Sequence, residues 1–417
     1  MKSIRPLFRL LIILATILQC TQPSDQSSQE PYVVLVSFDG FRHDYVERWQ
    51  LPNFQKLITQ GAQSGGLIPS YPSKTFPNHY TLVTGLLPGN HGLVDNQFYD
   101  RSKKAIYRMS DRSKVEDPDF YGGLPLWQLA QQSGIKTASY FWVGSEAPIA
   151  GSWPTYYKIY DGSVPNLERI NQVLDWLQLP AIDRPRFITL YFSLVDSKSH
   201  QHGPLADQTE QSVREADRLL GRLMDQIQEL DLPINLMVTS DHGMFPLSLK
   251  KESYLDLSAL TIEKDSTTIV INSGTQVQFY ISNPDKVAST YAALKRQENH
   301  FKVMKKEETP EAWGYRSHQR IGQVLLIAEN GFEFRNKISG TIGSSGTDTV
   351  GVHGYDASQT PDLWGIFYAL GPNIISGSKI PAFDNIHVFP LVTQILGLRN
   401  PEGIDGKAEV LQAIYQE

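Results

Sequence analysis

Residues 32–38 read "YVVLVSF", an almost entirely apolar run that is rich in β-branched residues and ends directly before Asp39. A run without polar alternation is typical of a strand that is buried on both faces of a parallel sheet. Three more runs of this kind occur at 187–195, 234–239 and 363–370. Because helical patterns separate them, the sequence predicts an α/β fold with a mostly parallel central sheet and helices on both faces.

Two other regions carry a clear pattern. Apolar residues recur at every third or fourth position in 208–231, which predicts a helix with one buried face. The region 246–345 instead mixes strand candidates with a helical pattern, and we interpret it as a small α+β insertion after which the sheet resumes. Its strand candidates are 268–271, 277–281 and 324–327, and its helix candidate is 287–297.

The N-terminal residues 1–20 resemble a secretory signal, in which basic residues precede the apolar run 10–18 and Cys20 follows. Cys20 is the only cysteine, so no intrachain disulfide can form. Its position is typical of a bacterial lipoprotein signal, with the polar segment 21–30 as a tether; the alternative is a simple cleaved signal with an incidental cysteine. We expect an exported protein of a Gram-negative bacterium, periplasmic or held at the membrane by a lipid anchor.

The chain of 417 residues has a formal net charge of −6. This balance argues against binding to nucleic-acid duplexes, which requires clustered positive charge. Nothing in the sequence indicates an oligomeric state.

Three of the strand candidates end in an aspartate: Asp39, Asp196 and Asp241. In open α/β sheets, ligands bind beyond the carboxyl ends of the strands. A single aspartate there could be a helix N-cap, but three carboxylates at one edge repel each other unless a cation neutralises them. The pattern therefore favours a multivalent metal ion.

Histidines accompany these aspartates. His200 follows Asp196 by four residues, so one helical turn would place both on the same side, and His242 follows Asp241 directly. His353 lies in a glycine-flanked loop, and His202 competes with His200 as a ligand candidate. Aspartate combined with imidazole suits zinc, whereas an oxygen-only set would suggest calcium or magnesium.

Thr75 stands before a predicted helix, with Pro77 near its first turn and Gly85 at its end. Its structural role would be that of a helix N-cap. Its functional role would use the same place, because the N-terminus of a helix attracts a phosphate and a metal-bound hydroxyl becomes a nucleophile. The residue types leave this choice open.

The chain resembles the nucleotide pyrophosphatase/phosphodiesterases of the alkaline phosphatase superfamily, and the resemblance extends over about 33–398. The motifs that carry it, in order, are "SFDGFRHDY" (37–45), "YPSKTFPNHYTLVTGLLPGNHGLVDN" (71–96), "SLVDSKSHQHGP" (193–204), "TSDHGM" (239–244) and "GVHGYD" (351–356). The resemblance implies an alkaline-phosphatase-like fold, with 31–417 as one catalytic domain of the minimal bacterial type.

The resemblance also implies two Zn²⁺ ions. The residues that correspond to the ligands of one ion are Asp39, Thr75, Asp241 and His242, with Thr75 also the nucleophile. Those that correspond to the ligands of the other are Asp196, His200 and His353. Ser199 stands where the family usually has glycine, which departs from the pattern without removing a ligand.

In the family's substrate pocket, Asn96 matches an asparagine that holds a non-bridging phosphate oxygen and is therefore a catalytic as well as a binding candidate. Phe76 and Tyr160 match the aromatic residues on either side of a nucleobase. Trp142 and Glu146 lie in a segment that lines the same pocket. Lys74, which precedes the candidate nucleophile, would approach distal phosphates.

The implied function is zinc-dependent hydrolysis of phosphodiester or phosphoanhydride bonds in nucleotides and related esters, through a covalent threonine intermediate. One alternative is a choline-type phospholipid phosphodiesterase or another hydrolase of the superfamily that uses the same site. The alternative without catalysis is a lipoprotein that binds a nucleotide or a metal ion.

Overall fold

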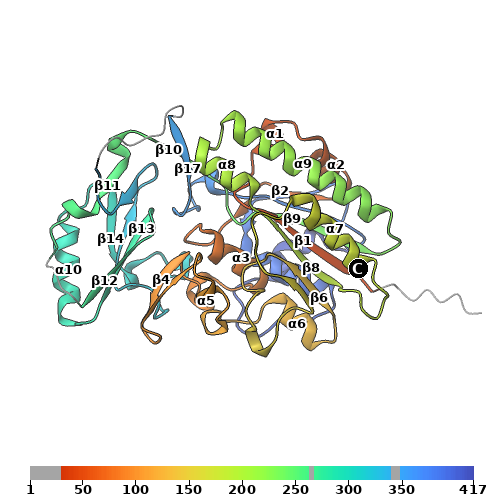
Figure 1. The fold of residues 1–417 in the computed structure, drawn as a ribbon, viewed down its shortest axis with the longest axis horizontal. Coiled ribbons are helices and arrows are strands. Elements are labelled where there is room, and N and C mark those ends of the chain that lie inside the picture. Colours follow the sequence, from red (N-terminus) through yellow and green to blue (C-terminus); the bar gives the residue numbers. More distant parts are fainter. Residues whose placement is uncertain (1–29, 263–266, 340–347) are drawn as a thin grey trace, which may run out of the picture.

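The computed structural model describes residues 30–262, 267–339 and 348–417 (Figure 1). The predicted signal segment and the predicted tether up to residue 29 lie outside the described residues. At the centre is an eight-stranded sheet of order β19-β2-β18-β9-β1-β8-β6-β7. Its strands are β1 (Tyr32–Phe38), β2 (Ala62–Ser64), β6 (Thr137–Tyr140), β7 (Tyr156–Lys158), β8 (Phe187–Phe192), β9 (Ile234–Thr239), β18 (Phe367–Leu370) and β19 (Ser378–Ile380).

The sheet is mostly parallel, as the sequence predicts. β9, β1, β8, β6 and β7 pair in parallel, whereas β18 runs antiparallel to both β9 and β2. This arrangement is consistent with the alkaline-phosphatase-like fold that the resemblance implies.

The side chains of β1 alternate between two cores, because successive residues of a strand point to opposite faces of the sheet. Val33 and Leu35 belong to the core beneath α3 (Thr75–Thr84), α6 (Leu126–Gln132) and α11 (Val388–Ile395). Val34 and Val36 belong to the core beneath α2 (Pro52–Gln60), α7 (Asn166–Leu177) and α9 (Asp207–Gln228). Both faces are therefore covered by helices, which explains why the strand has no polar alternation.

Helix α9 confirms the prediction for 208–231. Its buried residues include Val213, Ala216, Leu220 and Leu223, at helical spacing, and the opposite face is charged. Of the helices in the described part of the chain, none combines the length and the apolar character needed to span a bilayer.

Two strand predictions are wrong at their ends. The run 187–195 leaves the strand at Phe192, and Leu194 begins α8 (Leu194–His202), so Asp196 lies in the first turn of a helix. In the run 363–370, residues Pro361–Leu363 form a 3-10 turn and only Phe367–Leu370 is a strand. An apolar run does not by itself distinguish a buried strand from a buried helical turn, and Val195 is as buried as the strand before it.

The predicted insertion region contains its own antiparallel sheet, of order β12-β13-β15-β14, with a separate apolar core. Its elements are β12 (Thr268–Asn272), β13 (Gln276–Ile281), α10 (Asp285–Lys295), β14 (Phe301–Lys305) and β15 (Val324–Ala328). Figure 1 shows this sheet and α10 beside the main sheet, with the antiparallel pair β10 (Phe245–Ser248) and β17 (Thr349–Val352) leading into and out of it. Strand β14 has no counterpart in the sequence prediction.

The shorter elements surround these layers. They are α1 (Tyr45–Arg48), β3 (Leu67–Ile68), α4 (Pro88–His91), β4 (Gln97–Asp100), β5 (Ala105–Arg108), α5 (Arg112–Val115), β11 (Tyr254–Asp256), β16 (Glu333–Arg335) and β20 (Phe383–Asp384).

Candidate active site

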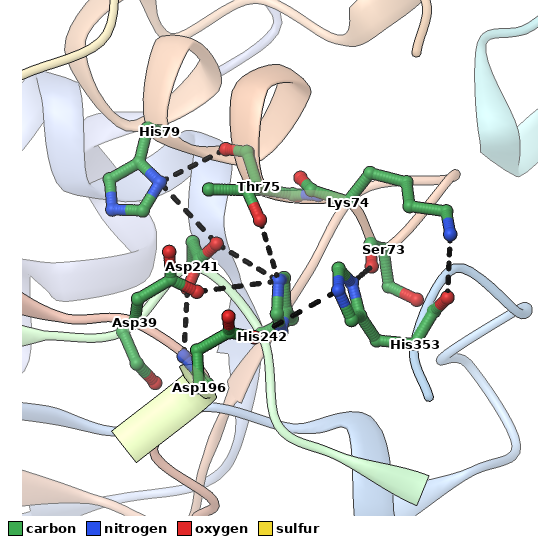
Figure 2. A network of polar contacts seen from close by, with 12 residues as sticks. Asp39, Ser73, Lys74, Thr75, His79, Asp196, Asp241, His242 and His353 are labelled. Atoms are coloured by element: carbon green, nitrogen blue, oxygen red, sulfur yellow. Dashed lines mark hydrogen bonds and ion pairs between the residues drawn. The ribbon is translucent and has the colours of Figure 1, made fainter. Parts of the chain in front are cut away.

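The three aspartates converge at the carboxyl edge of the sheet, as predicted. Asp39 and Asp241 follow β1 and β9 closely, and Asp196 lies in the first turn after β8, so three adjacent parallel strands deliver them (Figure 2). The close approach depends on Gly40, which has φ +67° and whose added Cβ would lie 2.9 Å from the Cα of Asp196. Only glycine fits this position without displacing the backbone.

Asp39, Asp241 and His242 form what we call the buried group. One potential ligand atom from each lies within 4.8 Å of the others. His242 Nε2 lies 3.1 Å from Asp241 Oδ2 and 3.6 Å from Asp39 Oδ1. The Thr75 hydroxyl Oγ1 lies 3.3 Å from the same Nε2, so the candidate nucleophile reaches this group.

Asp196, His200 and His353 form what we call the rim group. His200 Nε2 lies 3.2 Å from Asp196 Oδ1 and 3.1 Å from His353 Nε2. The rings of His242 and His353 stack with their centroids 3.7 Å apart, so the two groups adjoin. The structure thus brings the seven predicted ligand residues into one site, with His200 in contact with both Asp196 and His353.

The orientation of the three histidines suits a metal centre. Nδ1 of His242, His200 and His353 each lies 2.8 Å from a backbone carbonyl oxygen, of Gly243, Gly351 and Ser73 respectively. A neutral ring that donates its Nδ1–H to a carbonyl presents a lone pair at Nε2, which is the usual arrangement of metal-ligating histidine. The Nε2 atoms of His200 and His353 lie 3.1 Å apart, so both nitrogens point into the same place, where a cation could bind them.

The carboxylates point to the same conclusion. Asp39 Oδ1, Asp196 Oδ1 and Asp241 Oδ2 are buried and accept no hydrogen bond from the described residues. Buried charged oxygens are normally hydrogen-bonded or bound to a metal. Burial, together with the negative charges of Asp241 and Asp196, raises the pKa of Asp39 well above its ordinary value. The mixed oxygen and nitrogen donor set therefore fits divalent transition metals such as zinc.

Within the site, the imidazoles determine the charge of Asp241. Burial alone would raise the pKa of Asp241, but the neighbouring His242 and His79 outweigh it and hold the pKa well below its ordinary value. Burial lowers the pKa of His353 well below its ordinary value, and His242 and Lys74 lower it further. An ionised carboxylate and a neutral imidazole are the forms that bind metal ions.

Thr75 begins α3, but it does not cap the helix. The N-cap position belongs to Lys74, which has extended backbone angles, and no side chain caps the helix there. A backbone N–H of the first turn of α3, that of Phe76, donates its hydrogen bond of 2.9 Å to the amide oxygen of Asn96. The structural role considered for Thr75 is therefore wrong, and its hydroxyl is directed to the buried group instead.

A cavity of about 280 Å³ opens beside Thr75. Asp39, Asp196 and Thr75 line one part of it, and four of the five predicted substrate-binding residues, Phe76, Trp142, Glu146 and Tyr160, line other parts. The fifth, Asn96, lies outside this cavity and lines a neighbouring one together with Lys74. Trp142 Nε1 donates a hydrogen bond to the His79 carbonyl, and Arg112 forms an ion pair with Glu146 inside the cavity. An aromatic cavity with a few polar groups that adjoins ionisable residues is typical of a small-molecule site.

Sequence reasoning missed two residues that support the buried group. The Tyr191 hydroxyl donates a 2.6 Å hydrogen bond to Asp39 Oδ2. His79 lies 3.3 Å from Asp241 Oδ2 through Nδ1, and its Nε2 lies 2.9 Å from the Ser37 hydroxyl. The available signals were a tyrosine inside an apolar strand and a histidine one helical turn after Thr75, and both are weak.

The chain is similar to known phosphodiesterases over most of its length. Residues 33–356 match the family model described as Type I phosphodiesterase / nucleotide pyrophosphatase. The chain is 34% identical over 384 residues to ectonucleotide pyrophosphatase/phosphodiesterase family member 1 of Mus musculus, which covers 89% of this chain and 41% of that protein. It is also 34% identical over 390 residues to a venom phosphodiesterase of Naja atra, which covers 91% of this chain and 45% of that protein. The chain thus spans less than half the length of these relatives.

Solved structures give the same relationship. Murine ectonucleotide pyrophosphatase/phosphodiesterase 5, as an inactive threonine-to-alanine variant in complex with AMP, matches with a TM-score of 0.84 and 27% identity, over 93% of this chain and 100% of that chain. The human protein matches with a TM-score of 0.84 and 28% identity, over the same shares of the two chains. On the extent of the family match, the chain belongs to the type I phosphodiesterase / nucleotide pyrophosphatase family.

Proposed function

We propose that this protein is a zinc-dependent phosphodiesterase that hydrolyses nucleotide phosphodiester or phosphoanhydride bonds through a covalent threonine intermediate. One observation carries the proposal: the Thr75 hydroxyl lies 3.3 Å from His242 Nε2, at the place where partnerless carboxylate oxygens and histidine lone pairs meet. A metal ion bound by these donors would lower the pKa of the adjacent hydroxyl and make it a nucleophile. The aromatic cavity on its other side supplies a binding place for an organic group.

The ligand roles follow the two groups. Asp39, Asp241 and His242, with Thr75, would hold one Zn²⁺, and Asp196, His200 and His353 would hold the second. When bound, the two ions supply Lewis acidity, which lowers the pKa of a coordinated hydroxyl and neutralises charge on the phosphate oxygens. Around them, the Tyr191 hydroxyl donates a hydrogen bond to Asp39 Oδ2 and thereby fixes the orientation of that carboxylate.

The reaction has two steps. In the first, the Thr75 hydroxyl loses its proton to solvent, Oγ1 bonds to phosphorus, the bond from phosphorus to the leaving oxygen breaks, and the leaving oxygen takes up a proton from solvent. In the second, water attacks the phosphothreonine, the bond from phosphorus to Oγ1 breaks, and a phosphomonoester leaves while Thr75 recovers its proton. Asn96 contributes its side-chain NH₂, since its oxygen is already engaged by the Phe76 N–H. A preorganised donor of this kind contributes about 3–4 kcal/mol to transition-state stabilisation.

The cavity favours a nucleotide. Phe76 and Tyr160 both line it, and stacking of a base on an aromatic side chain contributes about 1–3 kcal/mol with little dependence on base identity. The AMP complex of the murine structural relative supports the same class of ligand. A choline-type headgroup needs aromatic and anionic surroundings, whereas here the Arg112 guanidinium already neutralises Glu146.

The experiment compares two chromogenic esters. Purified protein should release nitrophenol from thymidine 5′-nitrophenyl phosphate much faster than from nitrophenyl phosphate, a chelator should stop the reaction, and added zinc should restore it. A preference for the monoester would indicate a phosphomonoesterase, and cleavage of nitrophenylphosphocholine instead would indicate the phospholipid branch. Metal or nucleotide binding without release of nitrophenol would indicate a protein without catalysis.

We also propose that the protein is exported and anchored through a lipid on Cys20. The support is the N-terminal sequence, in which basic residues and an apolar run precede this cysteine. The test is expression of the full chain in a Gram-negative host with a labelled fatty acid. We expect label and membrane association in the wild type and their loss in Cys20→Ala; an unlabelled periplasmic protein would indicate a simple cleaved signal.

A further inference from the structure

Lys74 stands directly before the candidate nucleophile, and its ammonium group is already engaged. The side chain is buried, and Nζ donates a hydrogen bond of 2.8 Å to the His353 carbonyl (Figure 2) and one of 3.1 Å to the Ser273 carbonyl. One of these acceptors belongs to a candidate metal ligand, and the other belongs to the turn between β12 and β13 of the insertion. Lys74 therefore links three segments that are far apart in the sequence.

Ser73 strengthens the same connection. Its carbonyl accepts from His353 Nδ1 at 2.8 Å, and its hydroxyl accepts from the Gly354 N–H at 2.9 Å and donates to the Tyr355 carbonyl at 2.8 Å. We call this set of hydrogen bonds between 73–74 and 353–355 the clasp. Both the ring and the backbone of His353 are held by it.

The clasp is closely packed as well as hydrogen-bonded. Gly354 has φ +114°, and an added Cβ there would lie 2.3 Å from Lys74 Cε. The stem of Lys74 thus fills the space that any other residue at 354 would need, which is the kind of close approach that requires glycine. Small displacements of either segment are opposed by this packing.

We propose that Lys74 and Ser73 are positioning residues, which hold His353 of the rim group at a set distance from Thr75 and join the insertion to the catalytic centre through Ser273. This inference rests on the proposed function. Thr75 follows Lys74 directly, so the clasp transmits the position of the nucleophile to a ligand of the other group. Residues that orient a metal ligand typically change metal affinity or activity by about 10- to 100-fold when they are replaced.

The test uses the full chain with Lys74→Met, which keeps the apolar stem and removes the ammonium, and Ser73→Ala, which removes two bonds of the clasp. Lys379→Met on the exposed edge of β19 is the matched control. Three quantities are measured: bound zinc after gel filtration, the rate of zinc loss to a chelator, and kcat and KM, both for thymidine 5′-nitrophenyl phosphate and for ATP. For both clasp variants we expect faster loss of one zinc by about 10- to 100-fold and a decrease of kcat in the same range, with KM unchanged and with excess zinc restoring part of kcat.

Distinct results would overturn the proposal. Zinc content, zinc loss and kcat equal to those of the control would show that the clasp positions nothing. Normal zinc retention with KM raised only for ATP, which carries distal phosphates, would make Lys74 a substrate-binding residue instead. If Lys74→Met does not fold, Ser73→Ala decides between these results. A wild type that binds no zinc and does not cleave the ester would overturn the proposed function itself, a result that the variants alone cannot produce.

Discussion

The two candidate ligand groups are neighbours, but they are built differently. In the buried group, the side chains of Asp39, Asp241 and His242 are at most 2% exposed. In the rim group, Asp196 is 18% and His200 is 41% exposed, and only His353 is nearly covered, at 6%. The buried group is almost fully covered by protein and the rim group is partly open, although Asp39 of the first and Asp196 of the second both line the cavity.

Their supports differ in the same way. Side chains and a backbone N–H hold the buried group: Tyr191 binds Asp39, His79 contacts Asp241, and Gly40 N donates to Asp241 Oδ1 at 3.2 Å. Backbone carbonyls orient the histidines of both groups, so the difference lies in the support and the exposure of the carboxylates. We infer from it that the buried group would retain a metal ion more firmly, whereas the rim group is more open to water.

The largest effect is expected when the nucleophile is removed and both groups are left intact. Thr75→Ala should lower kcat by about three orders of magnitude or more, because it removes the hydroxyl that lies 3.3 Å from His242 Nε2 in the buried group. Zinc content should stay at the wild-type value, since the carboxylates and histidines of both groups remain. Thr75→Ser is the control that keeps a hydroxyl. Activity of Thr75→Ala close to that of the wild type would refute the threonine mechanism.

Matched ligand replacements test the difference between the groups directly. Asp241→Asn should lower zinc affinity and kcat by more than about 100-fold, because the amide leaves His242 and His79 without their buried anion. His200→Asn should lower zinc affinity and kcat by less, about 10- to 100-fold, because water can take the vacated position at the exposed rim. The measurement for both variants is the zinc that is lost during dialysis against a chelator, determined by atomic emission. Equal losses, or a larger loss for His200→Asn, would contradict the comparison.

Changes in the aromatic part of the cavity should leave both metal groups untouched. Phe76→Ala removes a stacking surface, and we expect a loss of about 1–3 kcal/mol in kcat/KM for thymidine 5′-nitrophenyl phosphate, mainly as raised KM. Tyr160→Ala should lower kcat/KM by less than Phe76→Ala, because the Tyr160 side chain is more exposed than that of Phe76. An ethyl nitrophenyl phosphate, which has no base, is the control substrate. If its turnover falls equally, the aromatic residues support the fold or the metal centre instead of the base.

The sequence predicted the edge at which these groups assemble, because buried strands and the residues that follow them are local patterns. The residue pattern placed the aspartates at this edge, whereas only the resemblance to the family grouped Thr75 with Asp39, Asp241 and His242. The strand before Asp196 was extended too far, because hydrophobicity alone does not separate a helical first turn from a strand. Thr75 was also considered as an N-cap, because threonine at a helix start usually has that role. Tyr191 and His79 could not be predicted, since their importance depends on which face of the sheet and of α3 they occupy. The clasp was equally hidden, because Lys74 and His353 meet only in the folded chain.

The smallest effect on catalysis is expected at His91. This histidine is as deeply buried as His242, but its ring nitrogens contact neutral groups of the protein instead of carboxylates. Its Nε2 lies 3.1 Å from the Thr81 hydroxyl, and its Nδ1 accepts from the Leu93 N–H at 3.2 Å, so the protein satisfies both nitrogens. Burial, aided by the positive charge of His318, lowers its pKa to about 3. Burial of a histidine is therefore not sufficient for a metal ligand.

His91 predicts a pH dependence of stability with a definite sign. Between its unfolded pKa of about 6.5 and its folded pKa, the unfolded chain binds a proton that the folded chain does not, so the free energy of unfolding decreases as the pH falls through this window, by up to about 1.4 kcal/mol per pH unit. His91→Gln, which cannot be protonated, should show a smaller decrease between pH 8 and pH 5, by about 1–2 kcal/mol, in urea unfolding of the zinc-free protein. At pH 8 its zinc content and kcat should match the wild type. If the free energy of unfolding of His91→Gln has the same pH dependence as that of the wild type, His91 is not its source. If His91→Gln loses zinc, His91 supports the metal site.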